Sequence, residues 1–389
     1  MAPLKKKILC ISVMEHWGGG EEFLLKLYEN IKEYEFVVAS PPGESSDKFT
    51  RAGMNVVNIK SLKKFYRTGN KWSFSSRLKI LFRIKISTIG LIKVILKHRI
   101  DFILCNGNLA GLYNLPAAVL TAKKFIVVQH LIYEKDSPEG KVLRLLNKFA
   151  SKLVCISDAV KENAVDLLGN KVKDNLIVIH HGISLPISSE SLERENKNRI
   201  SIGVIGSIIR LKGIDLIIDS LKDAIKKNHN VHINLFGGVR QDEPDSLKYN
   251  DEIYNMIETC GINDNVHFCG FESNKNKLYR DIDIVVNYST VAESFSLSVL
   301  EAMSYGKIVV AAKLGGPKEI IINGYNGFLV EPANSVRLRE CLEACIEKIN
   351  SEEFETIRKN ARSTVEEKFS LDQFTDAYKN LFNIESNIR

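Results

Sequence analysis

Short apolar runs that alternate with helix-like segments are the feature that most limits how this chain can fold. In the first half, the runs that we expect to be strands are Lys7–Val13, Phe36–Ala39, Val56–Ile59, Phe102–Cys105, Lys124–Val128, Leu153–Ile156 and Leu176–Ile179. Helical periodicity occurs between them at Glu21–Ile31, Arg77–His98 and Lys141–Ala150. Because near-continuous apolar strands alternate with helices, the pattern predicts a parallel sheet covered on both faces.

The second half of the chain repeats this pattern. Its expected strands are Ile200–Ile205, Val231–Phe236, Val266–Cys269, Ile284–Val286, Ile308–Ala311 and Phe328–Val330. Its expected helices are Gly213–Lys227, Asp251–Cys260, Asn274–Asp281, Leu297–Tyr305 and Ser335–Asn350. We therefore predict an α/β fold with two doubly wound, Rossmann-like domains, whose ligands would bind at the carboxyl ends of the strands in a cleft between the domains.

The domain boundaries follow from a break in this alternation. Residues 184–199 are polar, charged and aperiodic, so they are expected to form a linker. This places an N-terminal domain at 1–183 and a C-terminal domain at 200–370. Residues 371–389 are expected to form a C-terminal helix that can pack back on the first domain.

The composition excludes several other classes of protein. Hydrophobic residues make up 44% of the chain and charged residues 26%, which excludes disorder of the whole chain. No apolar run reaches the roughly 18 residues of a transmembrane helix, and the start KKKILCISVM predicts a first strand, not a signal peptide. Seven scattered Cys without a CxxC motif favour a reduced, cytoplasmic protein.

Positive charge is concentrated in one segment. The net charge is +7, yet 14 of the 54 Lys and Arg lie between Lys48 and Ile100, where no Asp or Glu occurs. Such a segment favours an anionic partner, which could be a membrane surface, a nucleic acid or an acidic substrate. Four aromatic residues are interleaved with the cations, namely Phe65, Tyr66, Trp72 and Phe74.

The helix expected at Arg77–His98 carries two stripes. The polar stripe consists of Lys79, Arg83, Gly90, Lys93 and Lys97, and the apolar stripe of Leu78, Leu81, Phe82, Ile89, Ile92 and Leu96. One interpretation is an ordinary helix packed on the sheet with its basic face in solvent. The other interpretation concerns the preceding loop, Lys60–Phe74, whose aromatic and basic residues would dock on anionic lipid.

Two glycine-rich turns each follow the first strand of a domain. Gly18–Gly20 precede the first helix, and Gly206 and Ser207 are followed by Arg210 and Lys212. Backbone N–H groups in such turns can approach an anion, and the two cations could neutralise a diphosphate. The alternative is a pair of tight turns with solvated cations, and the P-loop pattern GxxxxGK[ST] is absent.

Two carboxylates lie eight residues apart in ESFSLSVLE, at Glu293 and Glu301. If a helix begins near Leu297, both could face one pocket, with the N–H groups of Phe295, Ser296 and Leu297 between them. Such a pocket offers N–H donors to a phosphate and carboxylates to sugar hydroxyls. As a bare pair, they would more simply be two solvated glutamates, so the surrounding sequence has to decide.

That surrounding sequence, ESFSLSVLEAMSYGKIVVAAKLGGPKEII, resembles the E-x7-E signature of retaining glycosyltransferases of family four. GGGEEFLLKL, VVQH, VIHHGIS and IGSIIRLKG resemble further segments of that family, over roughly residues 7–365. The resemblance implies the GT-B fold, with two Rossmann-like domains. It also implies transfer of a sugar, with retention, from a nucleotide sugar (a UDP-sugar is favoured) to a saccharide acceptor, in surface polysaccharide or glycolipid assembly. The acceptor would be lipid-linked.

The resemblance also implies roles for single residues. Glu301 would hold the ribose hydroxyls, and Glu293 would lie beside the transferred sugar. Lys212 would neutralise the diphosphate, and His130 would lie near the sugar and the acceptor. The donor-binding set is Gly19, Gly20, Ser207, Arg210, Lys212, Phe271, Phe295, Ser296, Leu297 and Glu301.

The chain departs from the family pattern at several positions. Ser207 stands where the family usually has an arginine, which makes Arg210 the candidate for a second diphosphate clamp. Ser296 replaces a usual glycine, and His181 and Ser184 replace the Asn and Asp of the segment that closes the first domain. None of these changes removes the carboxylate pair.

No metal or other cofactor is expected. Asp281-Ile282-Asp283 matches the DxD metal signature of a different glycosyltransferase fold, but it lies at a helix end that runs into a strand. His180 and His181 are interpreted as structural residues rather than metal ligands.

Two other functions remain open, a sugar-nucleotide epimerase on the same fold and a nucleic-acid-binding protein that uses the basic segment. We favour the transferase without nucleic acid as a partner. It would be cytoplasmic and dock through Lys60–Arg99 on the inner face of the cytoplasmic membrane.

Overall fold

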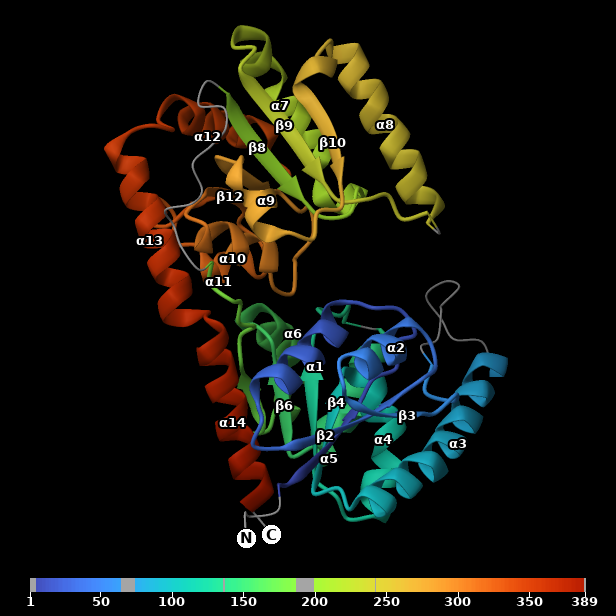
Figure 1. The fold of residues 1–389 in the computed structure, drawn as a ribbon. Helices are drawn as coiled ribbons and strands as arrows, with labels where there is room; N and C mark the ends of the chain where they lie inside the picture. The colour runs from blue at the N-terminus through green and yellow to red at the C-terminus, as the bar shows by residue number, and fades with distance from the viewer. Residues whose placement is uncertain (1–4, 64–73, 136, 187–198, 242, 388–389) are drawn as a thin grey trace. The chain divides into compact units, whose positions relative to one another are not determined.

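The structure, a computed structural model, describes residues 5–63, 74–135, 137–186, 199–241 and 243–387 (Figure 1). The chain divides into two compact units. Unit 1 comprises Met1–His181 together with Asp372–Arg389, and unit 2 comprises Gly182–Leu371. Each unit is built on one parallel sheet, so the predicted α/β fold with two Rossmann-like domains is confirmed.

Unit 1 contains a seven-stranded sheet in the order β3-β2-β1-β4-β5-β6-β7, and every neighbouring pair is parallel. The strands are β1 (Lys7–Ile11), β2 (Glu35–Ser40), β3 (Asn55–Asn58), β4 (Phe102–Asn106), β5 (Phe125–Gln129), β6 (Lys152–Cys155) and β7 (Leu176–Val178). The helices are α1 (Gly19–Asn30), α2 (Glu44–Arg51), α3 (Phe74–His98), α4 (Asn108–Leu120), α5 (Pro138–Phe149), α6 (Asp158–Leu168) and α14 (Leu371–Asn387). Both faces of the central strands are covered, which explains their unbroken apolar sequences.

Unit 2 contains a six-stranded parallel sheet in the order β10-β9-β8-β11-β12-β13. The strands are β8 (Ile200–Ile205), β9 (Val231–Phe236), β10 (Val266–Gly270), β11 (Ile284–Asn287), β12 (Ile308–Ala312) and β13 (Phe328–Val330). The helices are α7 (Ile214–Lys227), α8 (Pro244–Cys260), α9 (Lys275–Arg280), α10 (Leu297–Ser304), α11 (Pro317–Ile320), α12 (Ser335–Glu347) and α13 (Glu352–Lys368), and a short 3-10 turn, η2, lies at Arg210–Lys212. All the predicted strands of both halves are present, each within two residues of its expected ends.

Helix α14 belongs to unit 1, although it is the last element of the chain. The Tyr34 hydroxyl donates to Asn383 Oδ1 at 2.7 Å, and Lys379 Nζ lies 2.9 Å from a Glu33 carboxylate oxygen. The Tyr378 ring packs at 5.3 Å between centroids against Phe23 of α1. Contacts between aromatic rings therefore hold α14 against α1, one of the helices of unit 1.

Helix α3 corrects one expectation from the sequence. The apolar stripe that includes Leu81, Phe82 and Leu96 does not pack on the sheet, because these side chains are 63%, 65% and 66% exposed. The buried face carries Leu91 and Ile95 instead. Apolar residues occur on both the buried and the exposed sides of the helix, so its pattern could not decide which face is buried. Residues 64–73, which hold most of the predicted docking loop, lie outside the described part of the chain.

None of the described helices combines the length and the apolar sequence that a bilayer-spanning helix requires.

Candidate active site

The strand register of unit 1 gathers polar residues at one edge of its sheet. Ile11 of β1 lies opposite Cys105 of β4, and Cys105 lies opposite Val127 of β5. The polar residues Ser12 and Asn106, which come next in β1 and β4, therefore reach the carboxyl edge together. This is the edge at which ligands bind on doubly wound sheets.

A buried carboxylate organises this edge. Glu21 is 2% exposed, and its Oε1 accepts from the Ser12 hydroxyl at 2.8 Å and from Asn106 Nδ2 at 3.4 Å. Asn106 Oδ1 lies 2.7 Å from His130 Nε2. Because a carboxylate can only accept, the Asn106 amide presents its oxygen to the imidazole, and His130 Nε2 must carry the proton. Burial lowers the pKa of His130 from 6.5 to about 4, so this imidazole is neutral at pH 7.

Gly20 allows helix α1 to approach this network. Helix α1 begins at Gly19, with Gly18 as its N-cap in an extended conformation. A Cβ at Gly20 would lie 3.0 Å from Asn106 Nδ2, which is closer than an ordinary van der Waals contact. Of the two predicted glycines, Gly20 therefore lies close to Asn106, the residue that contacts His130.

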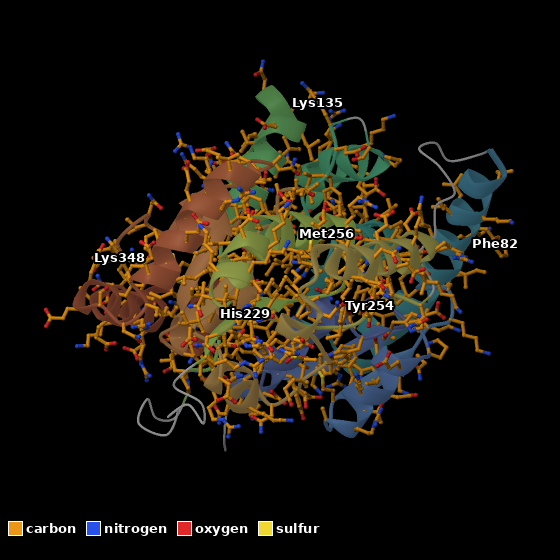
Figure 2. All side chains as sticks on the ribbon, turned by 90° about the horizontal axis from the view of Figure 1, so that it is seen from above. Phe82, Lys135, His229, Tyr254, Met256 and Lys348 are labelled. Carbon is orange, nitrogen blue, oxygen red and sulfur yellow. The ribbon has the colours of Figure 1, made fainter. Side chains whose placement is uncertain are left out.

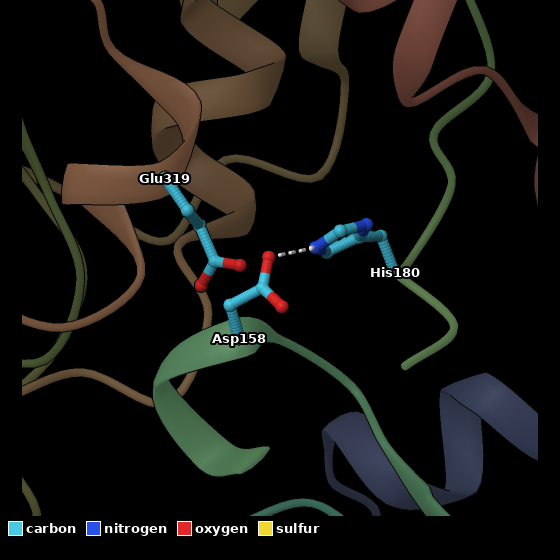
Figure 3. A group of neighbouring side chains, drawn as sticks. All are labelled: Asp158, His180 and Glu319. Atoms are coloured by element: carbon cyan, nitrogen blue, oxygen red, sulfur yellow. Dashed lines mark ion pairs between the residues drawn. The ribbon is translucent and has the colours of Figure 1, made fainter. Parts of the chain in front are cut away.

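The two neighbouring histidines of the predicted VIHHGIS segment have different partners. The His181 ring stacks on His130, with 5.9 Å between centroids and 18° between planes, and burial lowers its pKa well below the usual range. His180 Nε2 lies 3.6 Å from a carboxylate oxygen of Asp158, at the start of α6 (Figure 3). Glu319, drawn in the same figure, belongs to unit 2.

In unit 2 the corresponding edge holds an ion pair. Lys212, in η2, forms a short ion pair with Glu293 Oε1, and the Ser289 hydroxyl donates to the same oxygen. Asn287, the last residue of β11, donates from Nδ2 to Glu293 Oε2 at 3.4 Å and to Ser296 Oγ at 3.0 Å. The Lys212 and Glu293 side chains are only 25% and 16% exposed, so the pair is largely removed from water.

The ionised form of Glu293 is favoured in this setting. Burial by itself raises the pKa of the Glu293 carboxyl, but the positive charge of Lys212 and hydrogen bonds from Lys212, Ser289 and Ser296 outweigh it. The pKa of Glu293 therefore lies below its usual value, and its carboxyl group is ionised at pH 7.

Two glycines allow close backbone contacts in the loops around the Lys212–Glu293 pair. Gly237, which follows β9, has φ +144°, and a Cβ there would lie 1.9 Å from the Gly206 carbonyl oxygen. Gly315 has φ +63°, and its Cβ would lie 2.3 Å from the Glu293 carbonyl oxygen. The Gly316 N–H donates to that carbonyl at 2.8 Å. The GGP segment of the predicted signature thus holds the Glu293 loop in place.

Glu301 forms a second cluster in the same unit. Helix α10 begins at Leu297, as predicted, with Ser296 as its N-cap. Glu301 Oε2 accepts from Lys275 Nζ at 2.8 Å and from the Tyr279 hydroxyl at 3.0 Å. The two glutamates therefore have separate sets of partners, and the first turn of α10, with Phe295 directly before its N-cap, lies between them in the chain.

Two predicted donor-binding residues lie apart from these clusters. Arg210 pairs with Glu252, its guanidinium lies 4.7 Å from the centre of the Tyr249 ring, and its side chain is 59% exposed. Phe271 directly follows β10 and is 86% exposed. Ser207 follows Gly206 at the end of β8 and is partly buried.

A pocket of about 410 Å³ in unit 2 has a different lining. It lies along β8, β9 and α9 and is lined by residues that include Arg199, Asn234, Cys269, Lys277 and Arg280. The predicted site residues do not contribute to that lining.

Sequence reasoning missed several members of both networks. Ser12, Asn106 and Asn287 were not predicted, although each is the first polar residue after a buried run in a parallel strand. That position places a side chain at the ligand-binding edge of the sheet, so it is a signal that the sequence contains. Lys275 and Tyr279 lacked such a signal, because their contact with Glu301 depends on how α9 packs.

Residues 189–364 match the family described as Glycosyl transferases group 1, and residues 17–185 match Glycosyltransferase Family 4. Both halves of the chain match glycosyltransferase families. These matches support the resemblance to glycosyltransferases that we described for the E-x7-E segment.

Individual glycosyltransferases are similar over most of the chain. MJ1607 of Methanocaldococcus jannaschii is 28% identical over 267 residues, which is 65% of this chain and 65% of that relative, just under two thirds of its length. The capsular polysaccharide biosynthesis glycosyltransferase CapM of Staphylococcus aureus is 26% identical over 294 residues, which cover 70% of this chain and 74% of CapM.

Solved glycosyltransferase structures share the fold. HepE of Anabaena, crystallised in complex with UDP, superposes with a TM-score of 0.80 at 22% identity, covering 97% of this chain and 100% of HepE. The expected GT-B fold class is therefore confirmed.

Proposed function

We propose that the protein is a retaining glycosyltransferase that moves a sugar from a UDP-sugar to a saccharide acceptor. The observation that carries the proposal is the partly buried Lys212–Glu293 pair at the carboxyl edge of the second sheet, beside the Gly206 turn. The glycosyltransferase family matches and the resemblance to the E-x7-E signature support the same reaction.

Lys212 would stabilise the leaving group. When the sugar departs, negative charge develops on the nucleoside diphosphate, and stabilising that charge is the main catalytic task. The Lys212 ammonium is 25% exposed, so it would act in a partly water-excluded setting where charge interactions are stronger. Its present partner, Glu293, is held separately by Ser289 and Asn287. Glu293 would thus stay in place beside the transferred sugar when a diphosphate shares the lysine.

The remainder of the donor would extend from this pair. Glu301 would accept hydrogen bonds from the ribose hydroxyls, and the exposed ring of Phe271 would stack on the base. Backbone N–H groups at Ser296 and Leu297, where α10 begins, would face the sugar or a phosphate. Uridine is favoured because HepE, which shares the fold, was crystallised with UDP and with UDP-glucose.

Unit 1 would contribute the acceptor side. With its proton on Nε2, His130 has Nδ1 as an acceptor, and this nitrogen can receive a hydrogen bond from a sugar hydroxyl. Neutral imidazole suits this role better than imidazolium, which can only donate. Asn106 would act as a positioning residue, because it fixes the tautomer of His130.

We further propose a lipid-linked acceptor at an anionic membrane surface, on its cytoplasmic face. Polysaccharide assembly is suggested by the name of CapM, a capsular polysaccharide biosynthesis glycosyltransferase. The reaction is proposed to run without a metal, because the cation that faces the diphosphate would be Lys212. Transfer that continues in EDTA would support this, whereas loss of transfer that Mg²⁺ or Mn²⁺ restores would contradict it.

A donor screen tests the proposed function. Wild-type protein, Lys212→Ala and Glu301→Ala would be incubated with a panel of UDP-, GDP- and ADP-sugars and a saccharide acceptor. We expect transfer from a UDP-sugar by the wild type, retention at the anomeric carbon by NMR, and strong losses in both variants. Conversion of the sugar nucleotide to its epimer without an acceptor, or wild-type rates in both variants, would overturn the proposal.

A further inference from the structure

Helix α3 presents a wide apolar face to solvent. Six large apolar side chains on it are between 44% and 66% exposed, namely Leu78, Leu81, Phe82, Ile86, Ile89 and Leu96. Their spacing by three, four and seven residues places them on one side of the helix. Figure 1 shows α3 beside α4 at the edge of unit 1, and Figure 2 shows Phe82 on the outside. A contiguous exposed patch of this kind marks an interaction surface.

The opposite face holds α3 firmly on unit 1. Ile80, Leu91 and Ile95 on that face are at most 4% exposed. The Ser87 hydroxyl donates to Ser61 Oγ at 2.8 Å, and Gly90 packs so tightly that a Cβ would lie 3.3 Å from Ile59. The helix cannot turn its apolar face inward without breaking these contacts, so the exposed face is a fixed property of the fold.

Lysines are interleaved with the exposed apolar residues. Lys79, Lys85, Lys93 and Lys97 are all exposed on the same helix. They belong to the segment Lys48–Ile100, in which no acidic residue occurs. The partner that covers this face must therefore accept apolar side chains and carry negative charge.

We infer that this apolar, lysine-bearing face of α3 docks the protein in the plane of an anionic lipid surface. The aliphatic and aromatic side chains would enter the boundary between headgroups and acyl chains, and the lysines would lie at the lipid phosphates. The inference rests on the proposed function in one respect, the location of a lipid-linked acceptor. It replaces the loop Lys60–Phe74 by α3 as the principal docking element and assigns the partner to particular side chains.

Other occupants fit the face less well. A second copy of the chain would bring the lysines of two α3 faces against each other, which costs energy by like-charge repulsion. A single-stranded nucleic acid would satisfy the lysines, but it binds through stacking on aromatic rings and offers no apolar phase for Leu and Ile. A bilayer surface satisfies both requirements.

Vesicle flotation tests the inference with the full-length protein. Wild type would be compared with an apolar-face variant, Leu81→Ser/Phe82→Ser/Ile89→Ser, and a charge variant, Lys79→Gln/Lys85→Gln/Lys93→Gln. The matched controls are Ile322→Ser/Val336→Ser, which removes side chains that are 54% and 60% exposed in unit 2, and Lys226→Gln/Lys227→Gln at the exposed end of α7. Vesicles would be phosphatidylcholine alone or with phosphatidylglycerol.

Wild type and both controls should float with the anionic vesicles at least about tenfold more than with neutral ones. Each lysine removed should lower partitioning by roughly fivefold, from the ~1 kcal/mol per basic residue at such a surface. The apolar-face variant should lose at least about tenfold. Wild type that does not float, or an apolar-face variant that floats like wild type, would overturn the inference. So would a wild-type dimer, seen by light scattering, that the apolar-face variant abolishes.

A second readout separates this inference from the proposed function. The affinity for UDP, measured by calorimetry, should be equal in wild type and all the variants, because α3 carries none of the proposed donor residues. Equal UDP affinity with lost flotation supports membrane docking by α3. Failure of wild type to bind UDP would overturn the proposed function and leave the flotation result valid in its own right. Equal melting temperatures would show that the variants fold.

Discussion

The two sheets share strand order and direction, but their carboxyl edges are chemically different. In unit 1, the described bonds link the buried Glu21 through a neutral amide, Asn106, to a neutral imidazole, His130. In unit 2, the carboxylate at the edge is Glu293, which follows β11 and forms an ion pair with Lys212. One fold thus produces an edge at which a neutral amide and imidazole adjoin a buried carboxylate, suited to sugar hydroxyls, and an edge with an ion pair, whose lysine is suited to a diphosphate.

The difference arises from the residues that follow equivalent strands. After β1, residues 12–18 lead into α1, whose first turn places the acidic Glu21 on the sheet. After β8, residues 206–213 form a connection of similar length that includes η2, which places Lys212 over Gly206, at 3.2 Å between Lys212 Cε and a Cβ built at that glycine. The connection after the first strand thus supplies a carboxylate to one edge and a lysine to the other.

The largest effect is expected when the charged edge loses its cation. Lys212→Ala should lower kcat/KM for transfer by about 10²–10³-fold, the usual cost of removing one group that stabilises developing negative charge. Arg210→Ala is the matched control from the same 3-10 turn. Because Arg210 pairs with Glu252 and lies over Tyr249, its removal should cost less than about tenfold. Equal losses in both variants would show that Arg210 is a second diphosphate clamp.

The glycine contacts of the two edges should respond differently to a methyl group. Gly237→Ala should destabilise the protein by about 3 kcal/mol or more, because the added Cβ meets backbone at 1.9 Å and φ is +144°. Gly20→Ala should change stability by less than about 1 kcal/mol, because its neighbour is a side-chain amide at 3.0 Å and the helical position favours alanine. Thermal and urea unfolding would measure both, and similar losses would contradict this contrast.

Replacing Glu301 tests whether this residue binds the ribose of the donor, and the expected effect is smaller. Glu301→Gln should weaken UDP binding by about tenfold, since one charge-assisted hydrogen bond to the ribose is worth roughly 1.5 kcal/mol. Glu272→Gln is the control, because Glu272 also pairs with a lysine, Lys277, at 2.8 Å in the same unit. Calorimetry should show unchanged affinity for the control. A loss of the same size in both would assign the effect to surface charge.

The pH dependence of the free energy of unfolding should reveal the protonation of His130 at the edge of the first sheet. The folded pKa of His130 is about 4, below its usual 6.5, so the folded state binds fewer protons than the unfolded state between these values. Its contribution to stability is present above pH 6.5 and is lost as the pH falls from 6.5 towards 4. In His130→Gln the free energy of unfolding should therefore depend less steeply on pH in this window. Burial also lowers the pKa of His232 in unit 2 to about 4. The part of the pH dependence of unfolding that His232 contributes should remain in the variant, and it serves as the internal reference. An unchanged slope would contradict a His130 that stays neutral in the folded state down to about pH 4.

The sequence predicted the strands and the start of α10 because apolar β-branched runs and the E-x7-E spacing are local patterns. The contact between Asn106 and His130 could not be predicted, since it depends on β4 and β5 lying side by side. The direction of Arg210 depends on the distant Glu252, and the orientation of α3 depends on packing, because apolar residues occur on both its buried and its exposed sides. Properties set by neighbours in the chain were thus accessible, and those set by neighbours in space were not.

The central claim is that Lys212 binds the diphosphate, and calorimetry with UDP and UMP tests it most directly. Wild type should bind UDP at least about tenfold more tightly than UMP, because the β-phosphate meets the Lys212 ammonium. In Lys212→Ala this preference should largely disappear, while the affinity for UMP changes little. If the variant kept the full wild-type preference for UDP, the β-phosphate would be bound elsewhere, and the assignment of the charged edge would be wrong.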